Sequence, residues 1–389
     1  MSHRADPRLL ATLREYGALT IESCFNCGNC TAVCPLSAGE DQFPRRMIRY
    51  GQLGMRDALL ASKELWLCYA CGECTATCPR QADPGGFMAA ARRYAIASYD
   101  PLGLARLFLT SVRFSAAFLV LMAALAGFVA YSLHGPMAQD SLRLFDFIPA
   151  HAIHDAGIVA GFIVILLLAA GGMHMLLRVG RATGLPHLFK LRWFSALLMT
   201  VRDIFAHRRY RADCVTTADT QPWYLRTWFT HASMMWGFMG LFLATALDYA
   251  LSLAGLKPTG TWVPVWQPVR LLGTLAGILF IYGVTTVIIR RLFNTDRPAG
   301  GSTPPDWSFL ILLWLTGMTG FALELALYLP QPYAWSYWML PAHLVFVAEL
   351  FILLPFTTFA HVLYRPAALY IHILKSLPHS EPAPAGSSE

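Results

Sequence analysis

Long apolar stretches fill most of the chain after about residue 110. Six of them are long enough to cross the hydrocarbon core of a membrane, which needs about 20 apolar residues per helix. They cover residues 114–133, 153–177, 229–253, 269–289, 307–329 and 340–363. The pattern predicts a six-helix transmembrane domain.

The first 100 residues are more polar and follow a different pattern. Short helical stretches are expected at 44–50, 55–67 and 88–97, with little of the alternation typical of strands. We therefore predict a helical domain at 1–100, a membrane domain at 101–375 and a disordered tail at 376–389, where the composition is low in apolar residues.

Composition and charge agree with a membrane protein. Hydrophobic residues make up 56% of the chain and charged residues 14%, and the formal net charge is +7. The basic surplus lies between apolar stretches, chiefly at 178–211, Arg290, Arg291 and Arg365. Basic loops face the cytoplasm in membrane proteins, so we expect no nucleic acid partner. The chain starts without an apolar signal sequence, which predicts a multi-pass protein of the cytoplasmic (inner) membrane whose first domain is cytoplasmic.

One basic loop also carries a helical pattern. Between 187 and 207, large apolar residues recur with rough helical spacing among basic ones. This indicates an amphipathic helix that lies on the membrane surface or against a partner subunit. Ordinary packing within the chain is the alternative.

Eight of the nine cysteines lie before residue 79 and form an internal repeat. Each repeat has three cysteines spaced two residues apart and a fourth followed by proline, the spacing of bacterial two-cluster [4Fe-4S] proteins. Since the fourth cysteine binds the other cluster there, the predicted sets are crossed. The first set is Cys24, Cys27, Cys30 and Cys78, and the second is Cys68, Cys71, Cys74 and Cys34. Two structural zinc sites are the alternative, but they would not need eight thiolates in this spacing.

Histidines in the apolar stretches are candidate haem ligands, because histidine is costly inside a membrane. His343 and His361 are eighteen residues apart, which is five turns, or about 27 Å, on one helix. We predict that His231 pairs with His361 at the cytoplasmic side and His154 with His343 at the outer side, each pair holding a b-type haem. His174 is a reserve ligand for the inner haem.

Two carboxylates lie in the apolar stretches. Glu324 and Glu349 are surrounded by apolar residues in the sequence. They are candidates for a proton relay to a quinone, since quinone chemistry moves protons with electrons. The alternative is a protonated carboxyl group that is hydrogen-bonded to a neighbouring helix.

Three resemblances extend these expectations. Residues 43–96 resemble the alpha-helical ferredoxin of the heterodisulfide reductase C subunits, and residues 269–293 and 340–371 resemble helices of the dihaem cytochrome b (gamma) subunit of respiratory nitrate reductase. In that cytochrome family the last helix supplies one ligand to each haem. A second helix there has two histidines ten residues apart, where this chain has His231 but Leu241, so His154 is our inferred replacement. The whole architecture resembles the C-type membrane subunit of the quinone-interacting membrane-bound oxidoreductase (Qmo).

The expected fold class is thus all-α, an alpha-helical ferredoxin with two [4Fe-4S] clusters followed by a six-helix transmembrane cytochrome b bundle. The expected role is that of an electron-transfer subunit in a quinone-linked oxidoreductase complex. The last resemblance implies soluble flavin and iron-sulfur partner subunits and exchange of electrons with adenylylsulfate reductase of sulfur metabolism. The alternatives are a quinol-dependent reductase of a disulfide substrate and a structural membrane anchor without haem.

Overall fold

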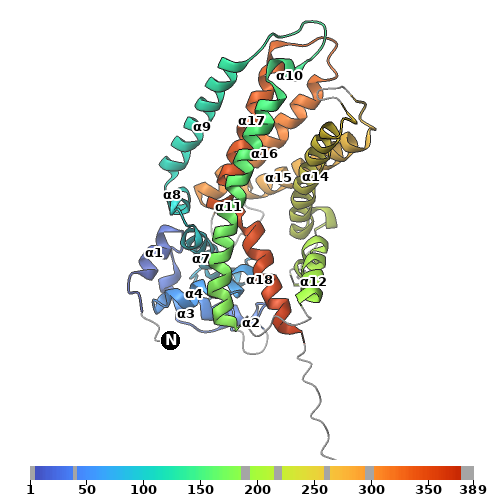
Figure 1. Cartoon of the computed structure of the whole chain (residues 1–389). Helices are drawn as coiled ribbons and strands as arrows, with labels where there is room; N and C mark the ends of the chain where they lie inside the picture. The colour runs from blue at the N-terminus through green and yellow to red at the C-terminus, as the bar shows by residue number, and fades with distance from the viewer. Residues whose placement is uncertain are drawn as a thin grey trace, which may run out of the picture.

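The computed structural model is built from helices, with a small domain at one end of a bundle of long helices (Figure 1). It describes residues 5–37, 42–184, 193–213, 221–257, 263–293 and 302–377. These residues contain no strand. The all-α prediction is therefore confirmed.

Six helices are long and apolar enough to cross a membrane. They are α9 Val112–Leu133, α11 Ala150–Thr183, α14 Thr227–Leu253, α15 Pro268–Leu292, α16 Pro304–Ala326 and the segment Ala334–Phe356, which includes α17 Ala334–Leu353. Proline at the first helical position starts α15 and α16, because its missing N–H has no intrahelical partner there. The first five predicted stretches agree with these helices to within a few residues at most of their ends.

The sixth prediction was wrong in an informative way. Residues 340–363 are not one helix: α17 ends at Leu353, two short turns follow at Leu354–Phe356 and Thr358–Ala360, and α18 spans His361–Ser376. Pro355 lacks an N–H and its ring clashes with the preceding turn, and Thr357 is fully extended at φ −120° and ψ −179°. His343 and His361 therefore lie on different helices.

Helices α14 and α15 pack closely over much of their length. A Cβ atom at Gly237 would lie 2.5 Å from the Phe280 nitrogen, and one at Gly283 would lie 2.8 Å from the Thr230 oxygen. Glycine at these crossings lets the two backbones approach, as is common between membrane helices.

The amino-terminal domain consists of short helices around one long one. They are α1 Leu9–Glu15, α2 Asn29–Ala32, α3 Arg45–Gln52, α4 Arg56–Leu60, α5 Glu64–Leu67, α6 Glu73–Ala76, α7 Pro84–Tyr99 and α8 Leu104–Thr110. The helix expected at 55–67 is interrupted between α4 and α5, where the Ser62 hydroxyl donates a hydrogen bond to the Ala58 carbonyl. The predictions at 44–50 and 88–97 correspond to α3 and α7.

This domain shares its apolar core with the bundle. Trp66 and Phe87 of the domain belong to the same buried cluster as Met175 of α11 and Tyr364 of α18. Arg93 also forms a buried salt bridge with Asp306, the residue that closes the capping box of α16. The small domain is thus fixed against the helices rather than tethered to them.

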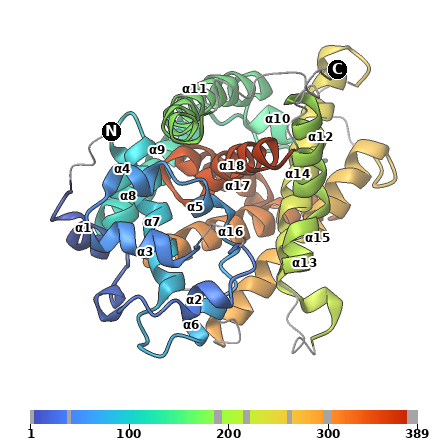
Figure 2. The ribbon, with the colours of Figure 1, turned by 90° about the horizontal axis from the view of Figure 1, so that it is seen from below.

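The basic loop forms two helices, α12 Trp193–Ala206 and α13 Arg208–Asp213, of which α12 lies beside α18 (Figure 2). Ala196 of α12 is buried against Leu369 and Ile373 of α18. Other apolar residues of α12, including Phe194 and Leu198, are exposed. The amphipathic helix therefore packs with one side and leaves another apolar side uncovered. Residues 187–192 of the predicted helix and 378–389 of the predicted tail lie outside the described residues.

Candidate iron-sulfur and haem sites

The two cysteine loops repeat each other in backbone conformation as well as in sequence. Gly28 and Gly72, at equivalent positions, have φ of 91° and 83°. Asn26 and Ala70, also equivalent, have φ of 62° and 56°. This left-handed region strains side chains other than glycine, so both loops curl tightly, and α2 and α6 begin directly after the two glycines.

The first group of thiols contains members of both repeats. Burial raises the pKa of the Cys30 thiol, and the charges of nearby cysteines raise it further. These neighbours are Cys24, Cys27 and Cys78. This is the grouping that the first crossed ligand set requires.

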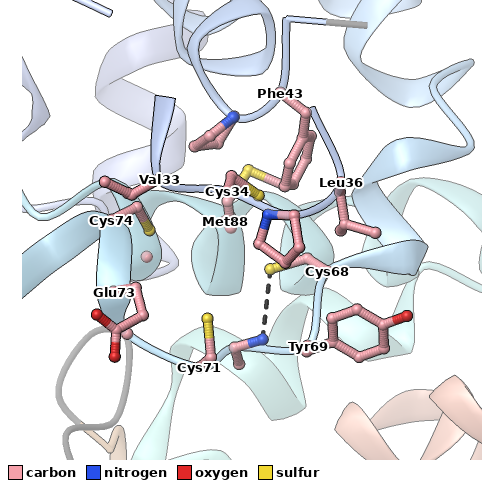
Figure 3. Close-up of a pocket in the computed structure, with 15 residues that line it drawn as sticks. Val33, Cys34, Leu36, Phe43, Cys68, Tyr69, Cys71, Glu73, Cys74 and Met88 are labelled. Carbon is pink, nitrogen blue, oxygen red and sulfur yellow. Dashed lines mark hydrogen bonds between the residues drawn. The ribbon is translucent and has the colours of Figure 1, made fainter. Parts of the chain in front are cut away.

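The second group is also mixed. Burial raises the pKa of Cys34 to about 11 and strongly raises the pKa of Cys74. The charges of neighbouring cysteines of the second repeat raise both pKa values further. Cys34, Cys68, Cys71 and Cys74 line one pocket with Leu36, Phe43 and Met88, and the four sulfur atoms surround a common space (Figure 3). Among the described residues, no three potential ligands converge tightly enough for one metal ion. A cubane cluster differs, because each thiolate binds a different iron.

Backbone N–H groups point at two of the sulfurs. The Ala70 N–H donates to the Cys68 sulfur over 3.4 Å (Figure 3), and the Ala82 N–H donates to the Cys78 sulfur over 3.4 Å. Hydrogen bonds of this kind stabilise the more negative, reduced state of a cluster and so set its potential.

The structure brings His231 and His361 together, as the inner pair was predicted to be. Their ring centres are 6.3 Å apart, with the ring planes at 58°. When two imidazole rings bind one metal from opposite sides, each through a nitrogen about 2 Å from it, the ring centres are roughly 6 Å apart. At this spacing, His231 and His361 could both bind one iron.

The hydrogen bonds of His361 leave the correct nitrogen free. Its Nδ1 lies 2.8 Å from the Thr358 carbonyl, which can only accept, so Nδ1 carries the proton. The Nε2 lone pair of the neutral ring is then available to a metal, while the second nitrogen is held by the backbone, the usual arrangement of metal-binding histidines.

A third imidazole, which the sequence analysis did not single out, orients His231. The Nε2 of His207 lies 3.0 Å from the Nδ1 of His231. His207 is buried and follows α12 at a left-handed backbone position, φ 48°. If His231 donates from Nδ1, its Nε2 is free in the same way as that of His361.

The outer pair is not brought together by the described contacts. The Nδ1 of His343 lies 2.9 Å from the Thr319 hydroxyl of α16, and that hydroxyl gives its proton to the Leu315 carbonyl. His343 therefore donates from Nδ1 and keeps Nε2 free. His154 contacts the Tyr249 ring of α14 at 4.5 Å between centres. Each histidine remains a predicted ligand, and their pairing stays a prediction.

His174 has other hydrogen-bond partners in the structure, and its role as a reserve ligand stays a prediction. Its Nδ1 lies 3.3 Å from the Tyr99 carbonyl, and its Nε2 accepts a hydrogen bond from the Arg178 Nε at 3.3 Å. Both ring nitrogens are thus used at the junction with the amino-terminal domain. The spacing of four residues between His174 and Arg178 is the signal in the sequence that would have indicated this contact.

The two carboxylates have different surroundings. Glu324 is ion-paired with Arg270, whose Nη2 lies 2.9 Å from its Oε1, so it is not an isolated carboxyl group. Glu349 is buried on α17, with an exposed fraction of 3%. Of the two predicted relay groups, Glu349 is the one left without a described ion pair.

Aromatic and basic residues connect the second cysteine loop to the inner histidines. Arg365 lies one helical turn after His361, donates to the Cys68 carbonyl over 2.9 Å and covers the Tyr69 ring. Tyr69 in turn contacts Tyr210, with ring centres 5.3 Å apart, and Tyr210 contacts His231 at 6.1 Å. The two candidate sites are therefore joined by direct contacts.

Known proteins match the cysteine domain. Residues 20–82 match the model of a 4Fe-4S dicluster domain. Citrate utilization protein B of Escherichia coli is 31% identical over 143 residues, 36% of this chain and 35% of that protein. A protein of Archaeoglobus profundus, described as like the C subunit of heterodisulfide reductase, is 37% identical over 109 residues, 26% of this chain and 58% of that protein.

A shorter match points the same way. The iron-sulfur C subunit of the CoB–CoM heterodisulfide reductase of Methanopyrus kandleri is 36% identical over 53 residues, 14% of this chain and 28% of that protein. No solved structure matches. The chain spans about a third of the first relative and just over half of the second. It carries an iron-sulfur electron-transfer domain related to heterodisulfide reductase C subunits, beside six helices that suggest a multi-pass membrane protein.

Proposed function

We propose that this chain is the membrane subunit of a quinone-linked oxidoreductase. Electrons pass between a quinone of the membrane, b-type haems, two [4Fe-4S] clusters and a soluble flavin-containing partner. The contact series from Cys68 through Tyr69 and Tyr210 to His231 carries this proposal. It offers a short route between the clusters and a pair of histidines that suits a haem.

The cluster ligands are proposed to be the crossed sets. Cys24, Cys27, Cys30 and Cys78 bind the first cluster, and Cys68, Cys71, Cys74 and Cys34 bind the second. The proximity of Cys30 to Cys78 and of Cys74 to Cys34 supports this assignment over one set per repeat. A cubane supplies one-electron chemistry when bound, and the cysteines hold it as thiolates.

For the inner haem, His231 and His361 are the proposed axial ligands. Their separation and the free Nε2 of His361 support this role. His343, which also keeps Nε2 free, is the proposed ligand of an outer haem, with His154 as its inferred partner. Glu349 is proposed to move protons for the quinone, since it is a buried carboxyl group in the same helix as His343.

Two soluble partners are candidates. The resemblance to the quinone-interacting oxidoreductase favours adenylylsulfate reductase together with related flavoproteins. The likeness to a citrate utilization protein covers 143 residues, which is more than the cluster domain alone, and favours a soluble partner that acts on a tricarboxylate. Cluster reduction by sulfite and AMP in the presence of adenylylsulfate reductase would support the first. Cluster reduction by a tricarboxylate that has an oxidisable C–H bond, in the presence of the soluble fraction, would support the second.

Cofactor counts test the proposal directly. The purified full chain is expected to contain about eight iron atoms in clusters with equal acid-labile sulfide, and a reduced-minus-oxidised spectrum is expected to show haem b. The variant His361→Ala should lose the inner haem and keep the cluster iron. His174→Ala, a matched histidine whose nitrogens are both used, should keep the haem. A wild-type chain with clusters but no haem b would contradict the proposal and leave a structural anchor.

A further inference from the structure

A basic groove lies beside the first cysteine loop. Its walls come from the loop at 22–26 and from α3, and Cys24 itself lines it. On α3, Met47 and Ile48 face the buried core. The helix therefore presents its arginines, Arg45, Arg46 and Arg49, to the groove.

The charge of the groove is strongly positive. Glu22 is the acidic residue among its lining residues, and it is ion-paired with Arg14. Arg46 lies 3.8 Å from Glu64, which offsets part of one charge. Arg45 and Arg49 remain as the basic groups for which no acidic neighbour is described. Such a surface attracts carboxylates and speeds the approach of an acidic protein.

The groove also borders the first cluster site, because Cys24 is one of its lining residues. Cys27 is exposed, and Phe25 beside Cys24 has an exposed fraction of 61%. The second site is covered on its membrane side, where Arg92 and Arg365 both donate to the Cys68 carbonyl. Cys71 of the second site is exposed as Cys27 is, but the groove is lined by Cys24. A soluble protein that binds in the groove therefore lies beside the first site.

We infer that this groove is the docking surface of the soluble electron partner, and that the partner presents a carboxylate-rich face to Arg45 and Arg49. The inference rests on the proposed function, because it assigns the first cluster as the place where electrons enter or leave the membrane subunit. Electron transfer would then connect the acidic partner, the first cluster, the second cluster and the inner haem, in that order.

Reduced flavodoxin, a small acidic flavoprotein, is the probe. Its hydroquinone gives one electron to an oxidised cluster and becomes the semiquinone, so cluster bleaching in a stopped-flow instrument reports the rate. The double variant Arg45→Glu with Arg49→Glu is compared with the full wild-type chain in detergent. A matched control, Arg106→Glu with Arg113→Glu, changes the net charge equally on α8 and α9, outside the groove.

We expect the groove variant to react on the order of tenfold more slowly at low ionic strength, with the difference fading as salt screens the charges. The control variant should keep the wild-type rate to within about twofold. Basic cytochrome c, oxidising the reduced clusters, should respond oppositely and react faster with the groove variant. Arg49→Glu alone should show an intermediate loss, because it reverses one of the two charges and leaves Arg45, whose side chain lies close to Gly28.

Equal loss in the control and groove variants, or no loss in either, would overturn the docking surface. Dithionite reduction separates this failure from others, with electron paramagnetic resonance to detect the reduced clusters and a reduced-minus-oxidised absorbance spectrum to detect haem b. If all variants show two clusters and haem b, the proposed function stands and only the groove is wrong. If the wild-type chain shows neither cofactor, the proposed function itself fails.

Discussion

Single side chains decide how the candidate haem site is held. His231 and His361 would bind iron through Nε2, and each uses Nδ1 for a neighbour. Such outer contacts fix the ring orientation and raise the basicity of the ligand. His207 is the partner of His231, and its effect on the haem is therefore open to measurement.

Replacing His207 with alanine should raise the midpoint potential of the inner haem. Loss of the hydrogen bond makes His231 a weaker donor, and a weaker donor stabilises ferric iron less. A hydrogen bond contributes about 1 kcal/mol, which corresponds to roughly 40 mV for one electron. A redox titration of haem absorbance measures the shift, and His207→Gln, which retains an acceptor oxygen, is the matched control. An unchanged potential in both variants would mean that the contact does not act on the iron.

The sequence could predict the candidate cluster and haem ligands but not all of their neighbours. Cysteine spacing alone gave both groups of thiols, because the ligand pattern is local. His207 was missed since its contact with His231, 24 residues away, depends on tertiary packing. Sequence position likewise did not show that Arg270 pairs with Glu324, fifty-four residues away.

At the scale of helices, the length of an apolar stretch predicted where a helix lies, but the presence of proline did not predict where a helix ends. The predicted spans agree with α9, α11, α14, α15 and α16 because a long apolar stretch in a membrane protein has few alternatives to a helix. Pro341 lies inside α17, whereas the regular helix ends just before Pro355. The sequence around the two prolines is similarly apolar. Local sequence does not distinguish these cases, since neighbouring helices determine whether the freed carbonyl is satisfied.

One contact between elements is expected to hold the amino-terminal domain in place. Arg93 and Asp306 form a salt bridge with exposed side-chain fractions of 7% and 14%, and Arg93 also donates to the Tyr16 carbonyl over 2.8 Å. Asp306→Ala would leave the buried guanidinium unpaired and remove half of the α16 capping box, a loss of about 3 kcal/mol in the free energy of unfolding.

Chemical denaturation in detergent, followed by cluster absorbance, measures this loss. The control Glu15→Ala removes the exposed salt bridge to Arg106. Because solvent screens this bridge, it contributes only about 0.5 kcal/mol to the free energy of unfolding. If the two variants unfold at the same denaturant concentration, the buried bridge does not stabilise the junction.

At the scale of the molecule, a shared apolar core joins two parts that differ in composition. Trp66, Tyr99 and Tyr364 pack together where α5, α7 and α18 meet, with ring centres 4.9 to 6.3 Å apart. Beside them, Arg365 joins the Cys68 loop to the helix that begins with His361. A rigid junction of this kind keeps the two candidate redox sites at a fixed separation, which a flexible tether would not.

This arrangement predicts that quinol reduces the clusters only through the inner histidine pair. In the wild-type chain, a short-chain quinol should reduce haem and clusters together, provided that the clusters have a suitable potential. In His361→Ala, quinol should reduce the clusters at least tenfold more slowly than in the wild-type chain. Dithionite, which reaches the clusters from water, should still reduce them at the normal rate. Stopped-flow absorbance of each cofactor measures both reactions, and His174→Ala serves as control. Fast cluster reduction by quinol in His361→Ala would show that electrons bypass the histidine pair and that the contacts through Tyr69 and Tyr210 are structural alone.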